Sequence, residues 1–321
     1  MNIPWLESQR QRIEQALVRQ RLGHAPLFCG PAGLGKLELA EWLMARLLCL
    51  APVDQAPCGT CRSCELLASG GHPDSFRLRI PEEKKEIPVD SVRQLISSLQ
   101  LTPRIGPHRV GLIEPAEAMN RNAANALLKT LEEPAENAWL ILVSHQPGQL
   151  PATIRSRCQK IVVRPPDDDQ ATAWLADRHA GVTPADRERA LALAAGAPLA
   201  ASDLLESDGL DFGQRILNGL LQVAQGGPVS AAVGDDWLAR PDLTWRWLAV
   251  WMAAFMRQSQ GLPGTELPDQ VALPRPVSAK RLAGLWERTL AGRQMADTAV
   301  RHDLLMGKWL LEWARIFPSG Q

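Results

Sequence analysis

The sequence predicts an α/β core, with a mostly parallel sheet covered by helices on both faces, followed by regions that contain helices only. Three observations predict it. Short apolar runs alternate with helical patterns up to about residue 164, a glycine-rich loop precedes a helical pattern, and no strand pattern follows the double proline at 165–166. Such alternation is typical of parallel sheets, because each strand returns through a helix on one face.

Four predicted strands are short apolar runs, at residues 27–29, 110–113, 139–143 and 161–163. A fifth is predicted at 76–80, where Phe, Leu and Ile alternate with Arg77 and Arg79. Apolar residues recur at helical spacing over 36–50, 92–101 and 122–132. One face of the second helix carries Val92, Leu95, Ile96 and Leu99, which predicts packing against the sheet.

Three domains are expected from the positions of the helix breakers. The α/β core covers residues 1–165 and ends where Pro165 and Pro166 break the chain, before aspartates that suit a helix start. A small helical lid follows over 166–207, and a helical domain covers 208–321. Its longer helices are predicted at 212–225, 243–258, 279–290 and 300–317. Residues 261–276 contain four prolines and are expected to form an extended connector.

The charge balance and the hydropathy exclude several classes of function. Lys plus Arg and Asp plus Glu both number 35 in 321 residues, so the formal net charge is zero. A protein that binds nucleic acid alone usually has a basic surplus, which argues against autonomous DNA binding. The first residues lack the apolar segment of a signal peptide, and no run approaches the ~20 apolar residues of a membrane span. We therefore expect a cytoplasmic protein.

A glycine-rich loop at residues 30–37 has the spacing of a phosphate-binding P-loop. Gly30, Gly33 and Gly35 precede Lys36 between a predicted strand and a predicted helix. The glycines allow backbone N–H groups to face a phosphate at the helix N-terminus, and the lysine reaches its oxygens. Leu37 stands where a Ser or Thr hydroxyl normally helps to hold Mg²⁺. Binding of ATP therefore stays open, because the glycines and the lysine are kept.

A second loss lies after the third predicted strand, which reads as a Walker B strand. Glu114 takes the place of the acid that directs Mg²⁺, but Pro115 follows where an active ATPase keeps a Glu to orient water. Proline offers neither a base nor a donor. Leu37 and Pro115 together indicate a nucleotide fold without its hydrolytic groups.

Four cysteines, Cys49, Cys58, Cys61 and Cys64, lie within 16 residues directly after the P-loop helix. In a cytoplasmic protein such a cluster indicates metal binding rather than disulfides. Structural zinc is the preferred interpretation, because four thiolates form a closed tetrahedral site. An iron–sulfur cluster is the alternative, although no proline follows the last cysteine and no second cluster is present.

Two further segments, NALLKTLEEP at 125–134 and LPATIRSRC at 150–158, resemble the signature of bacterial clamp-loader subunits of the AAA+ family. The resemblance covers residues 4–165, including the P-loop and the cysteines, and the early Pro4, Trp5 and Leu6 resemble the delta-prime type. It implies an AAA+ core, a helical lid and a helical collar that oligomerises.

The family resemblance also implies a function. Members form a pentameric loader that places a sliding clamp on primed DNA for DNA polymerase III during replication. Gamma/tau subunits hydrolyse ATP beside a delta subunit, and delta-prime is a non-hydrolysing stator. On this resemblance Arg157 is an arginine finger for a neighbouring subunit's ATP site, and Ser144 falls at a sensor position. No independent catalysis is expected from the chain, although it belongs to a DNA-directed DNA polymerase holoenzyme.

Several residues have a plain structural interpretation beside the functional one. Lys129 and Glu132 are expected to face solvent, although Glu132 and Glu133 at a helix C-terminus oppose its dipole, which favours an interface. Pairs of tryptophans four residues apart after residue 240 predict helical core. Two other functions stay open: an active clamp-loader-type P-loop ATPase, and a zinc-dependent DNA-binding module.

Overall fold

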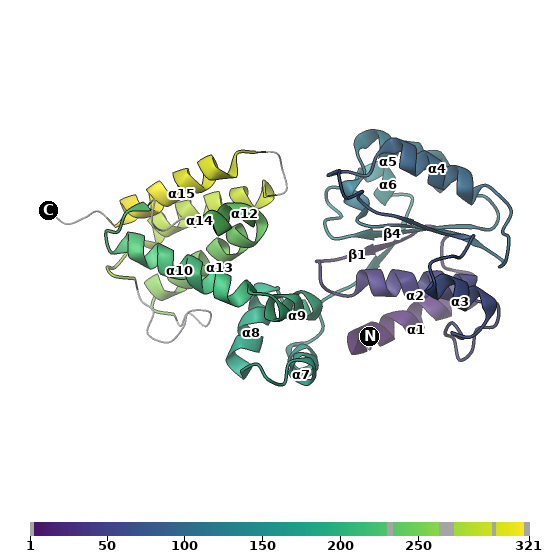
Figure 1. Ribbon diagram of the computed structural model, residues 1–321, viewed down its shortest axis with the longest axis horizontal. Coiled ribbons are helices and arrows are strands. Elements are labelled where there is room, and N and C mark those ends of the chain that lie inside the picture. The colour runs from purple at the N-terminus through teal and green to yellow at the C-terminus, as the bar shows by residue number, and fades with distance from the viewer. Residues whose placement is uncertain (1–2, 230–233, 263–272, 297–299, 318–321) are drawn as a thin grey trace. The chain divides into compact units, whose positions relative to one another are not determined.

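The computed structural model describes residues 3–229, 234–262, 273–296 and 300–317. The chain forms two compact units, Met1–Gln170 and Ala171–Gln321, and we describe each by itself (Figure 1). None of the described helices is long and apolar enough to cross a membrane.

The first unit contains one five-stranded parallel sheet. Its strands, in the order β2-β3-β4-β1-β5, are Ser75–Leu78, Arg109–Ile113, Ala138–Ser144, Pro26–Cys29 and Gln159–Val162. Each strand lies within two residues of its predicted bounds, so the predicted α/β fold class is confirmed. Helices cover both faces of the sheet (Figure 1). On one face lie α1 (Glu7–Val18), α2 (Lys36–Leu48) and α3 (Arg62–Ala68); on the other lie α4 (Val89–Leu99), α5 (Arg121–Glu132) and α6 (Ala152–Arg155).

The helices bury the faces that the sequence predicts. Val92, Leu95 and Leu99 of α4 are at most 5% exposed. Gly111 of β3 permits this packing, because a Cβ there would lie 3.0 Å from Leu95 Cδ1. Helix α5 begins at Asn120, whose side chain accepts a hydrogen bond from Ala123 N at 2.9 Å.

Parallel strands give this sheet two chemically different edges. We call the edge where the strands end the carboxyl edge, and the opposite one the amino edge. Gly30, Arg79 and Glu114 directly follow strands, and Ser144 ends one, so all four lie at the carboxyl edge. Arg157 precedes β5 and lies at the amino edge. Helices α2 and α5 each follow one strand and precede another, so they run from the carboxyl edge to the amino edge.

The second unit contains helices only, among the residues that the structure describes. They are α7 (Asp168–Arg178, which begins just before the unit), α8 (Pro184–Leu193), α9 (Pro198–Glu206), α10 (Gly209–Ala224), α12 (Asp235–Ala239), α13 (Pro241–Ser259), α14 (Ala279–Gln294) and α15 (His302–Ile316). Two hydrophobic clusters form, one around Leu175 and Leu191 and one around the tryptophans. The division into a lid and a collar stays a prediction, and most of the expected connector at 261–276 lies outside the described residues.

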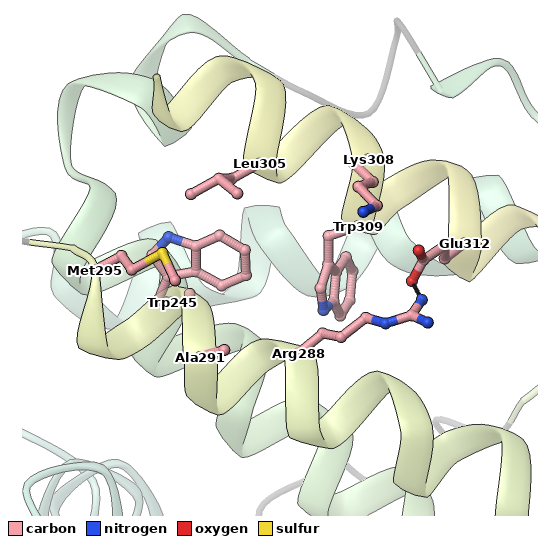
Figure 2. A pocket seen from close by; sticks show the side chains of 9 residues that line it. Trp245, Arg288, Ala291, Met295, Leu305, Lys308, Trp309 and Glu312 are labelled. Carbon is pink, nitrogen blue, oxygen red and sulfur yellow. Dashed lines mark ion pairs between the residues drawn. The ribbon is translucent and has the colours of Figure 1, made fainter. Parts of the chain in front are cut away.

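Tryptophans build the larger cluster, as their helical spacing predicts. Trp247 and Trp251 stack with ring centroids 5.0 Å apart, and Trp309 and Trp313 stack at 6.2 Å. A cavity of about 170 Å³ lies between α13, α14 and α15 (Figure 2). Figure 2 shows Trp245 and Trp309 as its aromatic walls, with charged side chains at one end. No P-loop residue lines this cavity.

Candidate functional site

The P-loop follows β1 at the carboxyl edge, and its own packing requires the glycines. Gly33 and Gly35 have φ angles of 75° and 82°, in the left-handed region. A Cβ at Gly30 would lie 2.3 Å from the backbone oxygen of Val163, and one at Gly35 would lie 2.8 Å from Leu6 Cδ1. Folding alone therefore explains why this loop keeps its glycines.

The N-terminal segment packs directly on this loop. A turn of 3-10 helix at Pro4–Leu6 buries Trp5 and Leu6. Trp5 Nε1 donates a hydrogen bond to Leu34 O at 2.9 Å. The Pro-Trp-Leu motif thus forms part of the structure that holds the P-loop.

Lys36 begins α2 and turns back onto the loop. Its side chain is buried, with the residue 2% exposed, and Nζ donates a hydrogen bond to Pro31 O at 2.5 Å. Burial lowers the pKa of Lys36 to about 8, although Glu117 and Glu114 nearby favour its charged form. The ammonium of Lys36, which would face a phosphate in a P-loop, is therefore hydrogen-bonded to a carbonyl of the loop itself.

Glu114 lies at the same edge and also has partners within the chain. Its Oε1 lies 3.4 Å from His145 Nε2, and its Oε2 lies 3.6 Å from Arg79 Nε. The hydrogen bond from His145 holds the pKa of Glu114 below its usual value. Pro115 follows, so the residue after Glu114 carries an apolar ring and no carboxylate.

Sequence reasoning missed three residues of this cluster: Arg79, His145 and Glu117. Glu117 Oε1 accepts hydrogen bonds from the backbone N–H groups of His145 and Gln146 at 2.8 and 2.9 Å, and so fixes the turn after β4. Ser144 ends β4, fully buried, and its Oγ has no hydrogen-bond partner among the described residues. The sensor role of Ser144 stays a prediction.

Arg157 lies between α6 and β5 at the amino edge, and its residue is exposed. Its Nε donates to Glu132 Oε1 at 2.7 Å, and its Nη2 forms an ion pair with the same oxygen. Its Nη1 donates to Thr153 O at 3.1 Å. Glu132 faces solvent as expected, but the fold also brings the end of α5 beside the loop before β5, where Glu132 pairs with Arg157. The strand β5 spans four residues, roughly 13 Å, and separates Arg157 from the edge that carries the P-loop.

The four predicted cysteine ligands come together after the end of α2. All four Sγ atoms lie within 4.8 Å of one another. The Sγ of Cys49 lies 3.6 Å from that of Cys58 and 4.0 Å from that of Cys61, and the Cys58–Cys64 distance is 4.0 Å. Sulfurs at 2.3 Å from a tetrahedral metal are roughly 3.8 Å apart, so this cluster can hold such an ion.

Backbone N–H groups donate to two of the four cysteine sulfurs, whereas burial raises the pKa of the Cys64 thiol to about 12. Cys61 N donates to Cys58 Sγ, and Cys58 N donates to Cys49 Sγ, both at 3.3 Å. Such bonds from Thr60 and Cys61 lower the pKa of the Cys58 thiol to about 6, which favours the thiolate that binds metals. Helix α3, which carries Cys64, is held against the end of α2, because Ser63 Oγ donates a hydrogen bond to Leu48 O at 2.6 Å.

Comparison with known proteins identifies the family. The family model described as "DNA polymerase III, delta subunit" matches residues 5–167. The chain is similar to the DNA polymerase III subunit delta' of Pseudomonas aeruginosa, with 40% identity over 99% of this chain and 98% of that protein. Identity to the Escherichia coli delta' subunit is 30%, over 99% and 96%. The tau/gamma subunit of Haemophilus influenzae is 35% identical over 51% of this chain and 23% of its own length. The chain therefore belongs to the family of DNA polymerase III delta' subunits, and its role is that of a clamp-loader subunit.

Proposed function

We propose that this clamp-loader subunit hydrolyses no ATP itself and uses Arg157 to complete the ATP site of a neighbouring subunit. The observation that carries the proposal is the position of Arg157 at the amino edge, across the sheet from its own P-loop. An arginine there is well placed for another chain's nucleotide and poorly placed for its own. A guanidinium against the transferring phosphoryl group stabilises the charge that develops on its oxygens.

The carboxyl edge supports the non-hydrolysing part of the proposal. Leu37 lacks the hydroxyl that holds Mg²⁺, and Pro115 lacks a carboxylate. Glu114, the remaining acid, lies against Arg79 and His145. Mg²⁺ binds carboxylate oxygens together with water or other oxygen ligands. Arg79 and His145 compete with such an ion for the carboxylate of Glu114.

We further propose that the partners are gamma/tau and delta subunits, and that the assembly acts on a sliding clamp and primed DNA. Similarity to proteins named delta' and tau/gamma supports this assignment. We propose zinc for the four-cysteine cluster, because thiolates at tetrahedral spacing suit that ion. The described cysteines form no disulfide, which agrees with a reducing compartment such as the cytoplasm.

Substitution of Arg157 tests the proposal. We expect Arg157→Ala to slow ATP hydrolysis at the adjacent site by about 10³-fold or more, so that turnover per assembled loader loses the contribution of one site. Arg157→Lys should restore little, because an ammonium lacks the planar fork of a guanidinium. Arg164→Ala, an exposed arginine at the other end of β5, is the matched control. Unchanged turnover in an intact Arg157→Ala complex would refute the proposal.

An active ATPase is the second candidate, because the P-loop keeps its glycines and Lys36. Turnover by the purified chain alone decides between the two. We expect none above a Lys36→Ala control; robust Mg²⁺-dependent hydrolysis that Lys36→Ala abolishes would establish the ATPase instead.

A further inference from the structure

We propose that Glu132 is the positioning residue of Arg157: its carboxylate holds the edge of the guanidinium formed by Nε and Nη2, and leaves the second N–H of Nη2 free for a phosphoryl oxygen. The inference rests on the proposed role of Arg157 in a neighbouring ATP site. It assigns a function to Glu132, the partner of Arg157 at the C-terminal end of α5.

The contacts hold the guanidinium from two elements. Glu132, the last residue of α5, receives Nε and Nη2 on one carboxylate oxygen. Thr153 O of α6 receives Nη1 at 3.1 Å, and Ser156 Oγ lies 3.4 Å from the same nitrogen. These partners fix a side chain that would otherwise lose considerable rotamer freedom when a neighbour docks.

The donor count shows what remains available. A guanidinium carries five N–H groups in a rigid fork. Glu132 takes one from Nε and one from Nη2, and Nη1 donates one to Thr153 O and one to Ser156 Oγ. The second N–H of Nη2 is left. It is available for an oxygen of a phosphoryl group.

A plain surface ion pair would explain the contact less completely. Exposed pairs usually add little stability, and Glu132 lies at a helix C-terminus, where a negative charge opposes the dipole. Its neighbour Glu133 is also exposed, but its carboxylate makes no hydrogen bond or ion pair within the described part of the chain. The two adjacent glutamates therefore form a natural pair of test and control positions.

The experiment measures ATP turnover of the assembled loader at saturating and limiting ATP. The reference is the part of the turnover that Arg157→Ala removes. We expect Glu132→Ala to remove at least half of that part through kcat, with KM changed less than about 2-fold, because small misplacements of a catalytic group are costly. Glu132→Gln keeps an acceptor for Nε and should restore most of it. Glu133→Ala should leave turnover unchanged, and Glu132→Ala should add nothing in the Arg157→Ala background.

The outcomes separate the two proposals. If Arg157→Ala has no effect, the proposed function fails. If Arg157→Ala lowers turnover and Glu132→Ala leaves it unchanged or raises it, only the positioning role fails. A further loss from Glu132→Ala in the Arg157→Ala background would also overturn the positioning role, because the glutamate would then act through another group.

Discussion

At the carboxyl edge of the sheet, Lys36 and Glu114 are buried or half-buried against groups of the same chain, whereas at the amino edge Arg157 is exposed and keeps one N–H of Nη2 free. Lys36 is bound to Pro31 O, and Glu114 lies between His145 and Arg79. Arg157 is held by Glu132 at the end of α5 and by Thr153 O and Ser156 Oγ near its own position.

The carboxyl edge shows a structural reason for the P-loop glycines that is independent of hydrolysis. The glycines at the carboxyl edge are needed because Val163 O and Leu6 approach them closely. Packing therefore accounts for Gly30 and Gly35 without reference to a nucleotide. At the amino edge Arg157 is exposed, which agrees with the proposed role toward a neighbouring subunit.

The largest expected effect is the difference in ATP turnover between a variant that lacks Lys36 at the carboxyl edge and one that lacks Arg157 at the amino edge. We expect Lys36→Ala to leave the ATP turnover of the assembled loader within about 2-fold of wild type, whereas Arg157→Ala silences one site by about 10³-fold. Steady-state turnover of the two complexes, with assembly checked by size-exclusion chromatography, measures this contrast. Equal losses would remove the distinction between the edges.

The second effect concerns the cysteine cluster, which follows α2 where that helix reaches the amino edge. We expect Cys61→Ser to lose the bound metal and to destabilise the α/β unit by several kcal/mol, because metal binding stabilises the folded ligand geometry. Metal analysis and thermal unfolding measure the two effects. Cys158→Ala, outside the cluster, should retain one metal per chain. A metal-free wild-type protein with the same melting temperature would contradict the prediction.

The third effect tests whether the buried charge of Lys36 lowers the free energy of unfolding. Burial lowers the pKa of Lys36 from 10.5 to about 8, so the folded state binds fewer protons than the unfolded state between these values, and stability rises with pH there. At pH 7 the buried charge therefore costs stability. We expect Lys36→Met to raise the free energy of unfolding by about 1–2 kcal/mol at pH 7, after the lost hydrogen bond is counted, and by less near pH 10.

Thermal unfolding at pH 7 and pH 10 measures this gain as a shift of a few degrees in the melting temperature. Lys129→Met, at an exposed position of α5, is the control and should show neither the gain nor its pH dependence. A destabilised Lys36→Met variant at pH 7 would show that the ammonium is well solvated or paired in the fold.

Much of the fold follows from local patterns. The three central strands, β3, β4 and β1, were predictable because they are continuous, almost entirely buried apolar runs, whereas the outer strands β2 and β5 are more polar and only partly buried. Helix α1 was missed because it is mostly polar, and one of its buried residues is charged. That residue, Glu14, is 1% exposed and pairs with Arg46 at 2.7 Å, a contact between helices 32 residues apart that no local period reveals.

The site was predictable to a similar extent. Motif spacing places the P-loop, Glu114 and Ser144 at one edge, because parallel strands end together. The partners of Glu114 were not predictable, since Arg79 and His145 follow two other strands and meet it only through the sheet order and register. The Glu132–Arg157 pair was missed for the same reason: 25 residues separate its members.

The smallest effect tests whether the two edges are mechanically independent. Helix α5 starts beside the carboxyl edge at Asn120 and ends with Glu132 at the amino edge. We expect Asn120→Ala to cost about 1 kcal/mol of stability through the lost N-cap, measured by thermal unfolding, whereas Asn120→Asp should keep the cap. Turnover of the assembled loader should stay within about 2-fold in both variants, because Glu132 is fixed by its contact with Arg157 and not by the first turn of α5. A large loss of turnover with Asn120→Ala alone would mean that strain at the carboxyl edge travels along α5 to Arg157, and that the edges act as one site.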